Sequence, residues 1–270
     1  MPELAALTAF AERAAAILHN DERVRILWLT GSLAAGTADA QSDVDLRAAV
    51  RAEDFAALEE WWPQMLDHLA PTVWKRRWPG PPNEAILSAI STDYQRFDLV
   101  IQSTTDTTPR ALEAARVLFD KDNLAGQINL TAPARHNPLA HLSFVVEEFI
   151  RLVGMLPIVV ERDDLPIGME GHFGLHSLLI SVLLLEQGID RTATGKRHVA
   201  PLLNDEQRAL LANLPSLEPT MKSVIEGRLA YARLFLPRAR RLMEANGLTY
   251  PAAFETATRQ HLAKTLGLNL

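Results

Sequence analysis

The feature that most constrains this chain is a Gly-Ser turn that follows a short apolar segment. Gly31-Ser32 comes directly after the β-prone run from Arg25 to Thr30, as expected where a buried strand enters a loop. Gly31 has no Cβ, so a phosphate can approach its backbone closely, and Ser32 can donate from its hydroxyl or cap a following helix. The pattern predicts an anion-binding turn at the end of a strand.

Two aspartates follow this turn in a strand-like pattern. After a spacer from Leu33 to Ser42 the sequence reads Asp43-Val44-Asp45-Leu46. The strand period of two puts Asp43 and Asp45 on one face and the two apolar residues on the other. Two carboxylates on one face repel each other unless a cation lies between them. Mg²⁺ fits because it takes hard oxygen ligands and completes its shell with water and substrate phosphates.

A third acid interrupts another apolar segment. Asp98 lies within the run from Arg96 to Ile101, at a position that otherwise belongs to a core strand. Three carboxylates on adjacent strands can hold two metal ions that bind the attacking and leaving oxygens of a displacement. Asp98 can instead accept the proton of an attacking hydroxyl. The three acids together predict metal-assisted transfer of a nucleotide.

The order Gly31, Ser32, Asp43, Asp45 and then Asp98 resembles the signature of the nucleotidyltransferase superfamily named after DNA polymerase β. Within that superfamily the chain looks most like the bacterial nucleotidyltransferases that adenylylate aminoglycosides or lincosamides. The segment from Val117 to Asp122 also looks like the short strand and turn that close the domain in those enzymes. The resemblance implies that Asp43, Asp45 and Asp98 are catalytic and bind Mg²⁺, and that Gly31 and Ser32 hold the triphosphate of ATP.

The same resemblance extends to residues outside the motif. Lys196 lies in a loop that resembles the basic loop with which related enzymes contact the triphosphate, and we expect it to help bind the nucleotide. Glu147 and Glu148 come early in the C-terminal half, and an acid at such a place would bind the acceptor or act as the base. The implied reaction moves AMP from MgATP to a hydroxyl of a small acceptor, with release of pyrophosphate. An aminoglycoside-type antibiotic is the expected acceptor.

Length and composition agree with a two-domain enzyme. The 270 residues are 48% hydrophobic and carry a net charge of −6, which allows a sizeable core and argues against extended nucleic-acid binding. Cysteine is absent, so disulfides, thiolate zinc sites and cysteine nucleophiles are excluded. No run of eighteen apolar residues and no secretory signal is visible, and we expect a cytoplasmic protein without a membrane span. The oligomeric state is not indicated.

The distribution of patterns along the chain predicts an α+β protein. We expect an N-terminal nucleotidyltransferase domain, residues 1–135, with a mixed β-sheet flanked by helices, and a C-terminal all-α helical bundle, residues 136–270, that binds the acceptor. The expected helices and strands of the first domain are the helices at 4–18, 53–69 and after Pro109, and the strands at 25–30, 72–78, 84–91 and 97–103. The expected helices of the second domain are 139–156, 173–187, 205–214, 217–246 and 251–266.

Several patterns have competing interpretations. The interleaved cations and aromatics from Val73 to Trp78 suit either base stacking or an exposed edge strand, and the edge strand is the simpler interpretation. His172 and His176 are one helical turn apart, but no glutamate follows His172, so packing histidines are expected. The spacing from Arg191 to His198 resembles that of helical ribonuclease toxins but is too short to be specific.

Two other functions remain open. The same site can modify a protein or RNA end, as in antitoxin-like or tRNA-acting members of the superfamily, and a basic substrate groove would favour that reaction. A non-catalytic nucleotide-binding module is the other possibility, and the three intact carboxylates argue against it.

Overall fold

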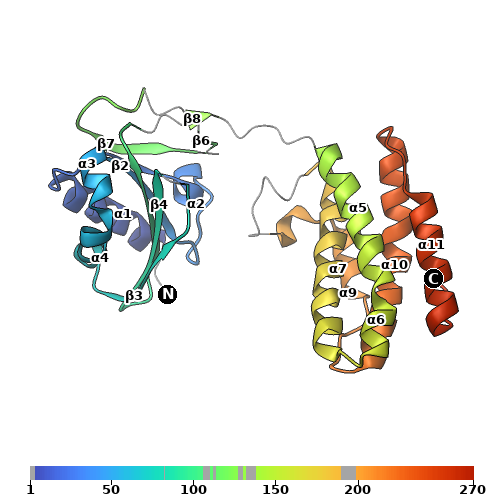
Figure 1. Ribbon diagram of the computed structural model, residues 1–270. Helices are drawn as coiled ribbons and strands as arrows, with labels where there is room; N and C mark the ends of the chain where they lie inside the picture. Colours follow the sequence, from blue (N-terminus) through green and yellow to red (C-terminus); the bar gives the residue numbers. More distant parts are fainter. Residues whose placement is uncertain are drawn as a thin grey trace. The chain divides into compact units, whose positions relative to one another are not determined.

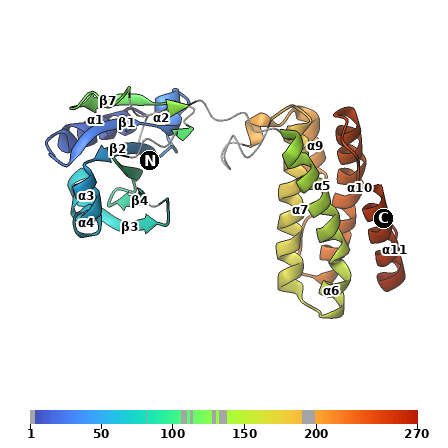
Figure 2. The ribbon, with the colours of Figure 1, turned by 45° about the horizontal axis from the view of Figure 1, so that its top comes forward.

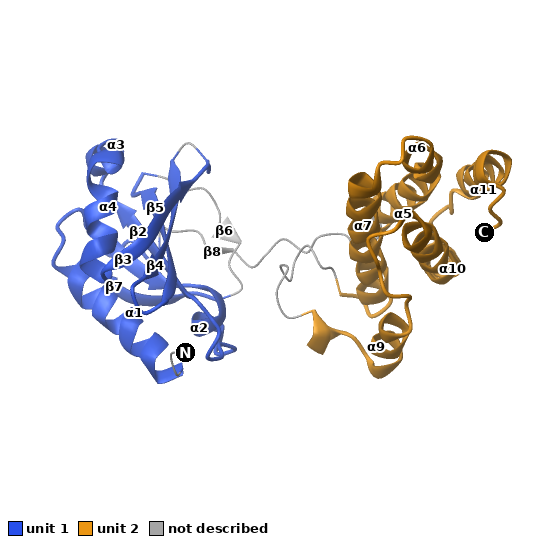
Figure 3. Ribbon diagram, turned by 90° about the horizontal axis from the view of Figure 1, so that it is seen from below, with its two compact units in different colours: residues 1–134 blue, residues 135–270 orange. Residues whose placement is uncertain are grey.

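The computed structural model describes residues 4–81, 83–105, 110–111, 114–126, 130–131, 138–189 and 199–270. The chain divides into two compact units, residues 1–134 and 135–270, which Figure 3 colours separately. All the strands described belong to the first unit, and the second unit is helical. The predicted α+β class is confirmed.

The first unit is built on a mixed six-stranded sheet in the order β3-β4-β5-β2-β1-β7 (Figures 1 and 2). Neighbouring strands are antiparallel except for β2 and β5, which form a central parallel pair. Two further short strands, β6 and β8, pair with each other. The strands are β1 (Val24–Leu29), β2 (Val44–Val50), β3 (Thr72–Trp78), β4 (Glu84–Ser91), β5 (Arg96–Ser103), β6 (Arg110–Ala111), β7 (Arg116–Asp120) and β8 (Leu130–Thr131).

One face of this sheet packs against helices and forms the core of the unit. The helices are α1 (Leu4–His19), α2 (Gly31–Ala35), α3 (Ala52–Ala56) and α4 (Leu58–Leu69). Apolar residues of α1 and α4 join the alternate strand residues Val44, Leu46, Phe97 and Leu99 in one buried cluster. This alternation sends the side chains of Asp45 and Asp98 to the opposite face of the sheet.

Two predictions for this unit need correction. The helix predicted over residues 53–69 is two helices, α3 and α4, that meet at Ala57. The short helix predicted after Pro109 is wrong at Arg110–Ala111, which form β6 instead because their backbone pairs with β8. Pro109 itself lies outside the described residues.

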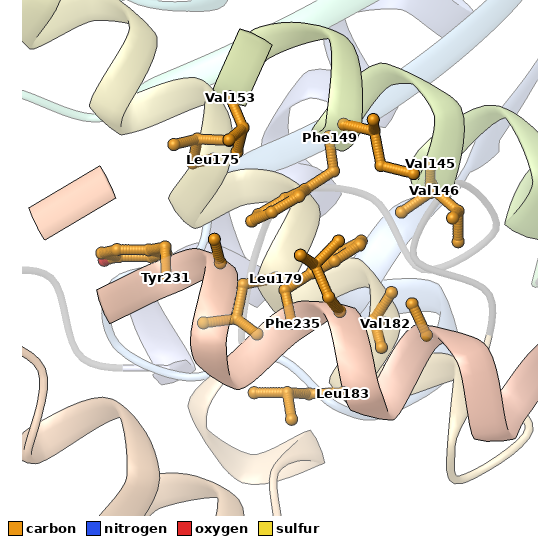
Figure 4. Close-up of a cluster of buried hydrophobic side chains, with 14 of the residues drawn as sticks. Val145, Val146, Phe149, Val153, Leu175, Leu179, Val182, Leu183, Tyr231 and Phe235 are labelled. Atoms are coloured by element: carbon orange, nitrogen blue, oxygen red, sulfur yellow. The ribbon is translucent and has the colours of Figure 1, made fainter. Parts of the chain in front are cut away.

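The second unit consists of helices around a single apolar core. Its elements are α5 (Pro138–Gly154), α6 (Leu156–Glu161), α7 (Leu165–Leu185), the short 3₁₀ helix η1 (Ala200–Leu202), α9 (Asp205–Ala212), α10 (Met221–Ala245) and α11 (Ala252–Leu266). Figure 4 shows the centre of the core, where Phe149 of α5 and Phe235 of α10 stack with ring centroids 3.6 Å apart. Leu179 and Val182 of α7 pack beside them.

The helix predicted from Phe173 begins earlier, because α7 starts at Leu165. Asp164 caps it by accepting a hydrogen bond from the backbone N–H of Ile167, and Pro166 occupies its first turn. Three glycines, at 168, 171 and 174, lower the helix propensity of this stretch, and for this reason no helix was predicted before Phe173. Their role is close packing, since neighbouring helices approach the backbone at these positions.

Among the described helices, α7 is long and apolar enough by length and composition to cross a membrane. Half of its most apolar window is buried inside the unit, and Leu175, Leu179 and Leu183 belong to the core. A helix at the core of a protein unit can have the same length and apolar composition as a membrane-spanning helix, and α7 lies at the core of its unit.

Two polar side chains are buried reciprocally between α7 and α10. Arg228 of α10 is 2% exposed and lies over Gly171 of α7, while His172 lies over Gly227 of α10. The Arg228 Nη1 donates to the carbonyl of Leu152 at 2.8 Å, near the end of α5. Burial lowers the pKa of Arg228 to about 10. The arrangement depends on both glycines lacking a side chain.

We predict that Gly171→Ala destabilises the helical unit, although alanine is the better helix former. A Cβ on Gly171 would lie 2.5 Å from the Arg228 Nη2, and overpacking of this kind costs about 1–3 kcal/mol. The control is Gly154→Ala, where the new Cβ would make an ordinary 3.5 Å contact with Thr258. Urea unfolding should show a lower midpoint for Gly171→Ala alone, and equal midpoints would contradict the packing described.

We also predict that the helical unit loses stability as the pH falls. Burial, and next the positive charges of Arg228 and of protonated His176, hold the pKa of His172 below its usual value of 6.5. Above pH 6.5 both folded and unfolded chains keep this ring neutral. As the pH falls below that value, the unfolded chain gains a proton that the folded chain resists, so the free energy of unfolding falls until the lowered pKa is passed.

The measurement is urea unfolding between about pH 8 and pH 5, for the native chain and for His172→Gln. The native chain should lose more stability over this range than the variant, which has no titrating ring at this position. Parallel pH dependence in the two proteins would contradict the prediction.

Candidate functional site

The predicted turn and the predicted acidic strand meet at Gly31. This glycine begins α2 with a φ of +64°, a backbone conformation that residues other than glycine rarely adopt. A Cβ at this position would lie 2.0 Å from the Asp45 Oδ2 and 2.9 Å from its Cγ. The carboxylate of Asp45 therefore lies against the Gly31 backbone, in space that only a glycine leaves open.

Asp45 and Asp98 are direct neighbours across the central parallel strands. The register of β2 and β5 pairs Asp45 with Asp98, as it pairs Val44 with Phe97 and Leu46 with Leu99. The four apolar residues are buried in the core on the helix-covered face, so the two carboxylates share the other face. Like charges at opposed positions destabilise a sheet, and a bound cation relieves that cost.

Asp43 lies immediately before β2 and is buried. Its alternation with Asp45 gives it the same face of the sheet. The backbone N–H of Thr30 donates to the Asp45 carbonyl at 2.9 Å, which ties the end of β1 to the start of β2. Ser32, in the first turn of α2, is half-buried.

A buried ion pair on the same face was missed by the sequence analysis. The Arg47 Nη1 contacts the Glu84 Oε2 at 3.2 Å and the Gln102 Oε1 at 3.3 Å. These residues come from β2, β4 and β5, so their contact depends on strand register. The only sequence signal was a long polar side chain within each of these otherwise apolar strands. Arg47 lies two residues after Asp45, and Glu84 neutralises it.

The donor set at Asp45 and Asp98 suits Mg²⁺, because carboxylate oxygens are hard ligands and this ion often needs only one or two of them besides water and phosphate. Among the described residues no group of three or more His, Cys, Asp or Glu side chains is arranged to hold a metal ion. The two-metal arrangement of Asp43, Asp45 and Asp98 therefore stays a prediction.

The residues expected at the acceptor belong to the helical unit. Glu147 is exposed on α5, and Glu148 is held by Arg151 through two bonds of 2.6 and 2.7 Å. The hydrogen bonds and charge of Arg151 keep the pKa of Glu148 below its usual value, so it stays ionised and partnered. Their substrate role stays a prediction. Lys196, and the spacing from Arg191 to His198, lie outside the described residues.

The two histidines of α7 pack within the helical unit. His172 makes an edge contact with the ring of Tyr231, and the His176 Nδ1 lies 2.8 Å from the Tyr231 hydroxyl. These contacts agree with the packing interpretation of the pair.

No family model matches the chain, and a search of curated proteins found no match. Among solved structures the chain is similar to an aminoglycoside 6-adenyltransferase from Bacillus subtilis, with 14% identity and a TM-score of 0.39 over 97% of this chain and 98% of the other. It is also similar to a nucleotidyltransferase-like protein from Exiguobacterium sibiricum 255-15, with 15% identity and a TM-score of 0.30 over 96% and 86%.

A third similar structure is the CdnC:HORMA-deltaN complex of E. coli MS115-1, with 14% identity and a TM-score of 0.28 over 97% of this chain and 90% of the other. At these identities and TM-scores all three likenesses are distant.

We predict that Gly31→Ala abolishes binding of MgATP, because the new methyl group would displace the Asp45 carboxylate. Gly36→Ala is a matched control, since Gly36 has a similar φ of +71° but nothing within 4 Å of a built Cβ. Both variants should lose about 1–2 kcal/mol of stability from the strained backbone. Calorimetric titration should show lost MgATP binding in Gly31→Ala only, and equal affinities in the two variants would refute the role of this contact.

Proposed function

We propose that this protein transfers a nucleotidyl group from a nucleoside triphosphate to a hydroxyl of an acceptor, with release of pyrophosphate. The observation that carries the proposal is the placement of the Asp45 and Asp98 carboxylates side by side on β2 and β5, with Asp45 against the side-chain-free backbone of Gly31. Two adjacent carboxylates beside a glycine turn suit a metal-bound triphosphate, because the turn leaves room for phosphate and the acids bind the metal.

In this reaction Asp43, Asp45 and Asp98 would hold Mg²⁺, and Gly31 and Ser32 would contact the triphosphate. Bound Mg²⁺ supplies charge neutralisation at the phosphates. Where Asp98 serves as the base instead of a metal ligand, it accepts the proton of the acceptor hydroxyl, the freed oxygen bonds to the α-phosphorus, and the bond from that phosphorus to the bridging oxygen breaks. The electron pair of the broken bond leaves with pyrophosphate. Alignment of the reacting oxygen with phosphorus provides much of the rate enhancement.

ATP as the donor and an aminoglycoside-type antibiotic as the acceptor remain the specific form of this proposal. They rest on the resemblance of the motif, together with Lys196 as a nucleotide-binding residue and Glu147 or Glu148 as an acceptor-binding residue. A cytoplasmic location belongs to the same proposal.

We predict that Asp45→Asn and Asp98→Asn each lower pyrophosphate release by about two orders of magnitude or more, while the fold persists. The melting temperature should stay close to that of the native chain, because the buried apolar residues behind the two strands remain in place. Glu59→Gln is the control, because Glu59 forms an exposed ion pair with Arg77 beside the helix-covered face and such pairs contribute little.

The measurement is pyrophosphate release from MgATP by the full chain, with aminoglycosides, lincosamides and short RNAs as acceptors. Release that requires an acceptor and both aspartates supports the proposal, and the acceptor that triggers it identifies the substrate class. Unchanged release in Asp45→Asn would refute the catalytic assignment. Tight MgATP binding without release for any acceptor would leave the nucleotide-binding module as the function.

A further inference from the structure

A line of polar side chains extends from the carboxylate pair to the edge of the sheet. The register pairs Asp45 of β2 with Asp98 of β5, Asp98 with Ser88 of β4, and Ser88 with Arg76 of β3. These four residues therefore form one row across four neighbouring strands (Figure 2 shows β3 and β4 at one side of this unit). At about 4.8 Å per strand, the Arg76 backbone lies about 10 Å from that of Asp98.

The cations of β3 divide between the two faces of the sheet. Lys75 contacts Asp67 at 2.6 Å, and Arg77 contacts Glu59 at 2.9 Å, both on α4. Those contacts place both cations on the helix-covered face, so Arg76 between them faces the carboxylate side. In the part of the chain that the structure describes, Arg76 makes no ion pair. Its side chain instead contacts an aromatic ring.

That ring is the indole of Trp78, over which the Arg76 Cζ lies at 4.3 Å from the centroid. The Trp78 Nε1 donates to the Ser88 Oγ at 2.9 Å, which fixes the orientation of the ring. Trp78 is 38% exposed, and Trp74, which shares its face, is 39% exposed. We call Trp74, Arg76 and Trp78 the edge strip. It combines an oriented aromatic surface with an arginine that has no acidic partner among the described residues.

We propose that the edge strip binds the acceptor of the reaction, and that this acceptor is a nucleotide rather than the aminoglycoside-type antibiotic that the resemblance of the motif implies. Its base would stack on the indole or guanidinium planes, and its phosphate would receive hydrogen bonds from Arg76. The inference rests on the proposed function for the position of the reacting hydroxyl, which would lie at Asp98. The glycine turn follows β1, on the other side of Asp45 from Asp98. The donor would therefore approach the two carboxylates from the side of Gly31, and the acceptor from the side of Arg76.

The charge of the strip decides between acceptor classes. A polycationic acceptor would place its ammonium groups near Arg76, where no described acid compensates the repulsion. A nucleotide supplies the missing anion and a planar ring in one molecule. The shared chemistry, a base next to a phosphate, is provided both by a free mononucleotide and by the end of an RNA.

The test is calorimetric titration of AMP into the full chain that has been saturated with Mg²⁺ and α,β-methylene-ATP, so that the donor site is occupied. Arg76→Gln and Trp78→Leu should each weaken AMP binding about tenfold. Arg77→Gln removes a cation from the same strand on the other face and should leave the affinity unchanged. Melting temperatures of the variants establish that β3 remains folded. Adenosine, which lacks the phosphate, should bind more weakly than AMP, and Arg76→Gln should weaken adenosine binding less than it weakens AMP binding.

The outcomes distinguish a free mononucleotide from an RNA end as the acceptor. They also distinguish a failure of this inference from a failure of the proposed function. Tighter binding of a short RNA than of AMP supports an RNA end as the acceptor, and equal or weaker binding supports a free mononucleotide. AMP binding that is absent, or insensitive to Arg76→Gln and Trp78→Leu, overturns the inference. Pyrophosphate release with an aminoglycoside at a rate unchanged by Arg76→Gln overturns it too, while the proposed function stands. Arg76-dependent AMP binding without any release would refute the proposed function, and the edge strip would then stand as a nucleotide-binding site without a transfer reaction.

Discussion

The first unit depends on an apolar face that holds two acids at neighbouring positions. In β2 and β5, Val44, Leu46, Phe97 and Leu99 are buried under the helices, and each such side chain contributes roughly 1.5–3 kcal/mol when buried. The same register places Asp45 opposite Asp98 on the other face. The burial outweighs the repulsion that opposed carboxylates cause. The protein therefore holds two carboxylates side by side with stability that comes from the core behind them.

Glycine has a related role in both units, as the place where a polar side chain meets a backbone. Gly31 leaves space for the Asp45 carboxylate, Gly171 for the Arg228 guanidinium, and Gly227 for the His172 ring. In the helical unit this close approach buries an arginine and a histidine between α7 and α10. A glycine in a helix lowers its propensity, so the packing at these positions must compensate for that loss. The two helices lose helix propensity at these glycines. In return Arg228 and His172 can be buried against the backbone, where a larger residue than glycine would leave no space.

The sequence predicted what depends on local pattern, and missed what depends on register. The alternation in Asp43-Val44-Asp45-Leu46 was enough to assign the two faces of β2, and the apolar periodicity located the long helices. The start of α7 was missed because its glycines serve packing against other helices. The strand at Arg110–Ala111 was missed because its partner is β8. The contact between Arg47 and Glu84 joins strands far apart in sequence, so no local pattern encodes it.

The same dependence on register bears on the acceptor. The net charge of −6 favours a cationic acceptor when the chain is considered as a whole, but interactions between exposed charges are largely screened beyond about 8–10 Å. In our proposal the acceptor lies along the local row, whose sign changes from the acids Asp45 and Asp98 to the cation Arg76. A molecule held along it needs a reacting hydroxyl at the acidic end and an anion at the other. That polarity, set by strand pairing, is a stronger guide to the acceptor than the overall charge.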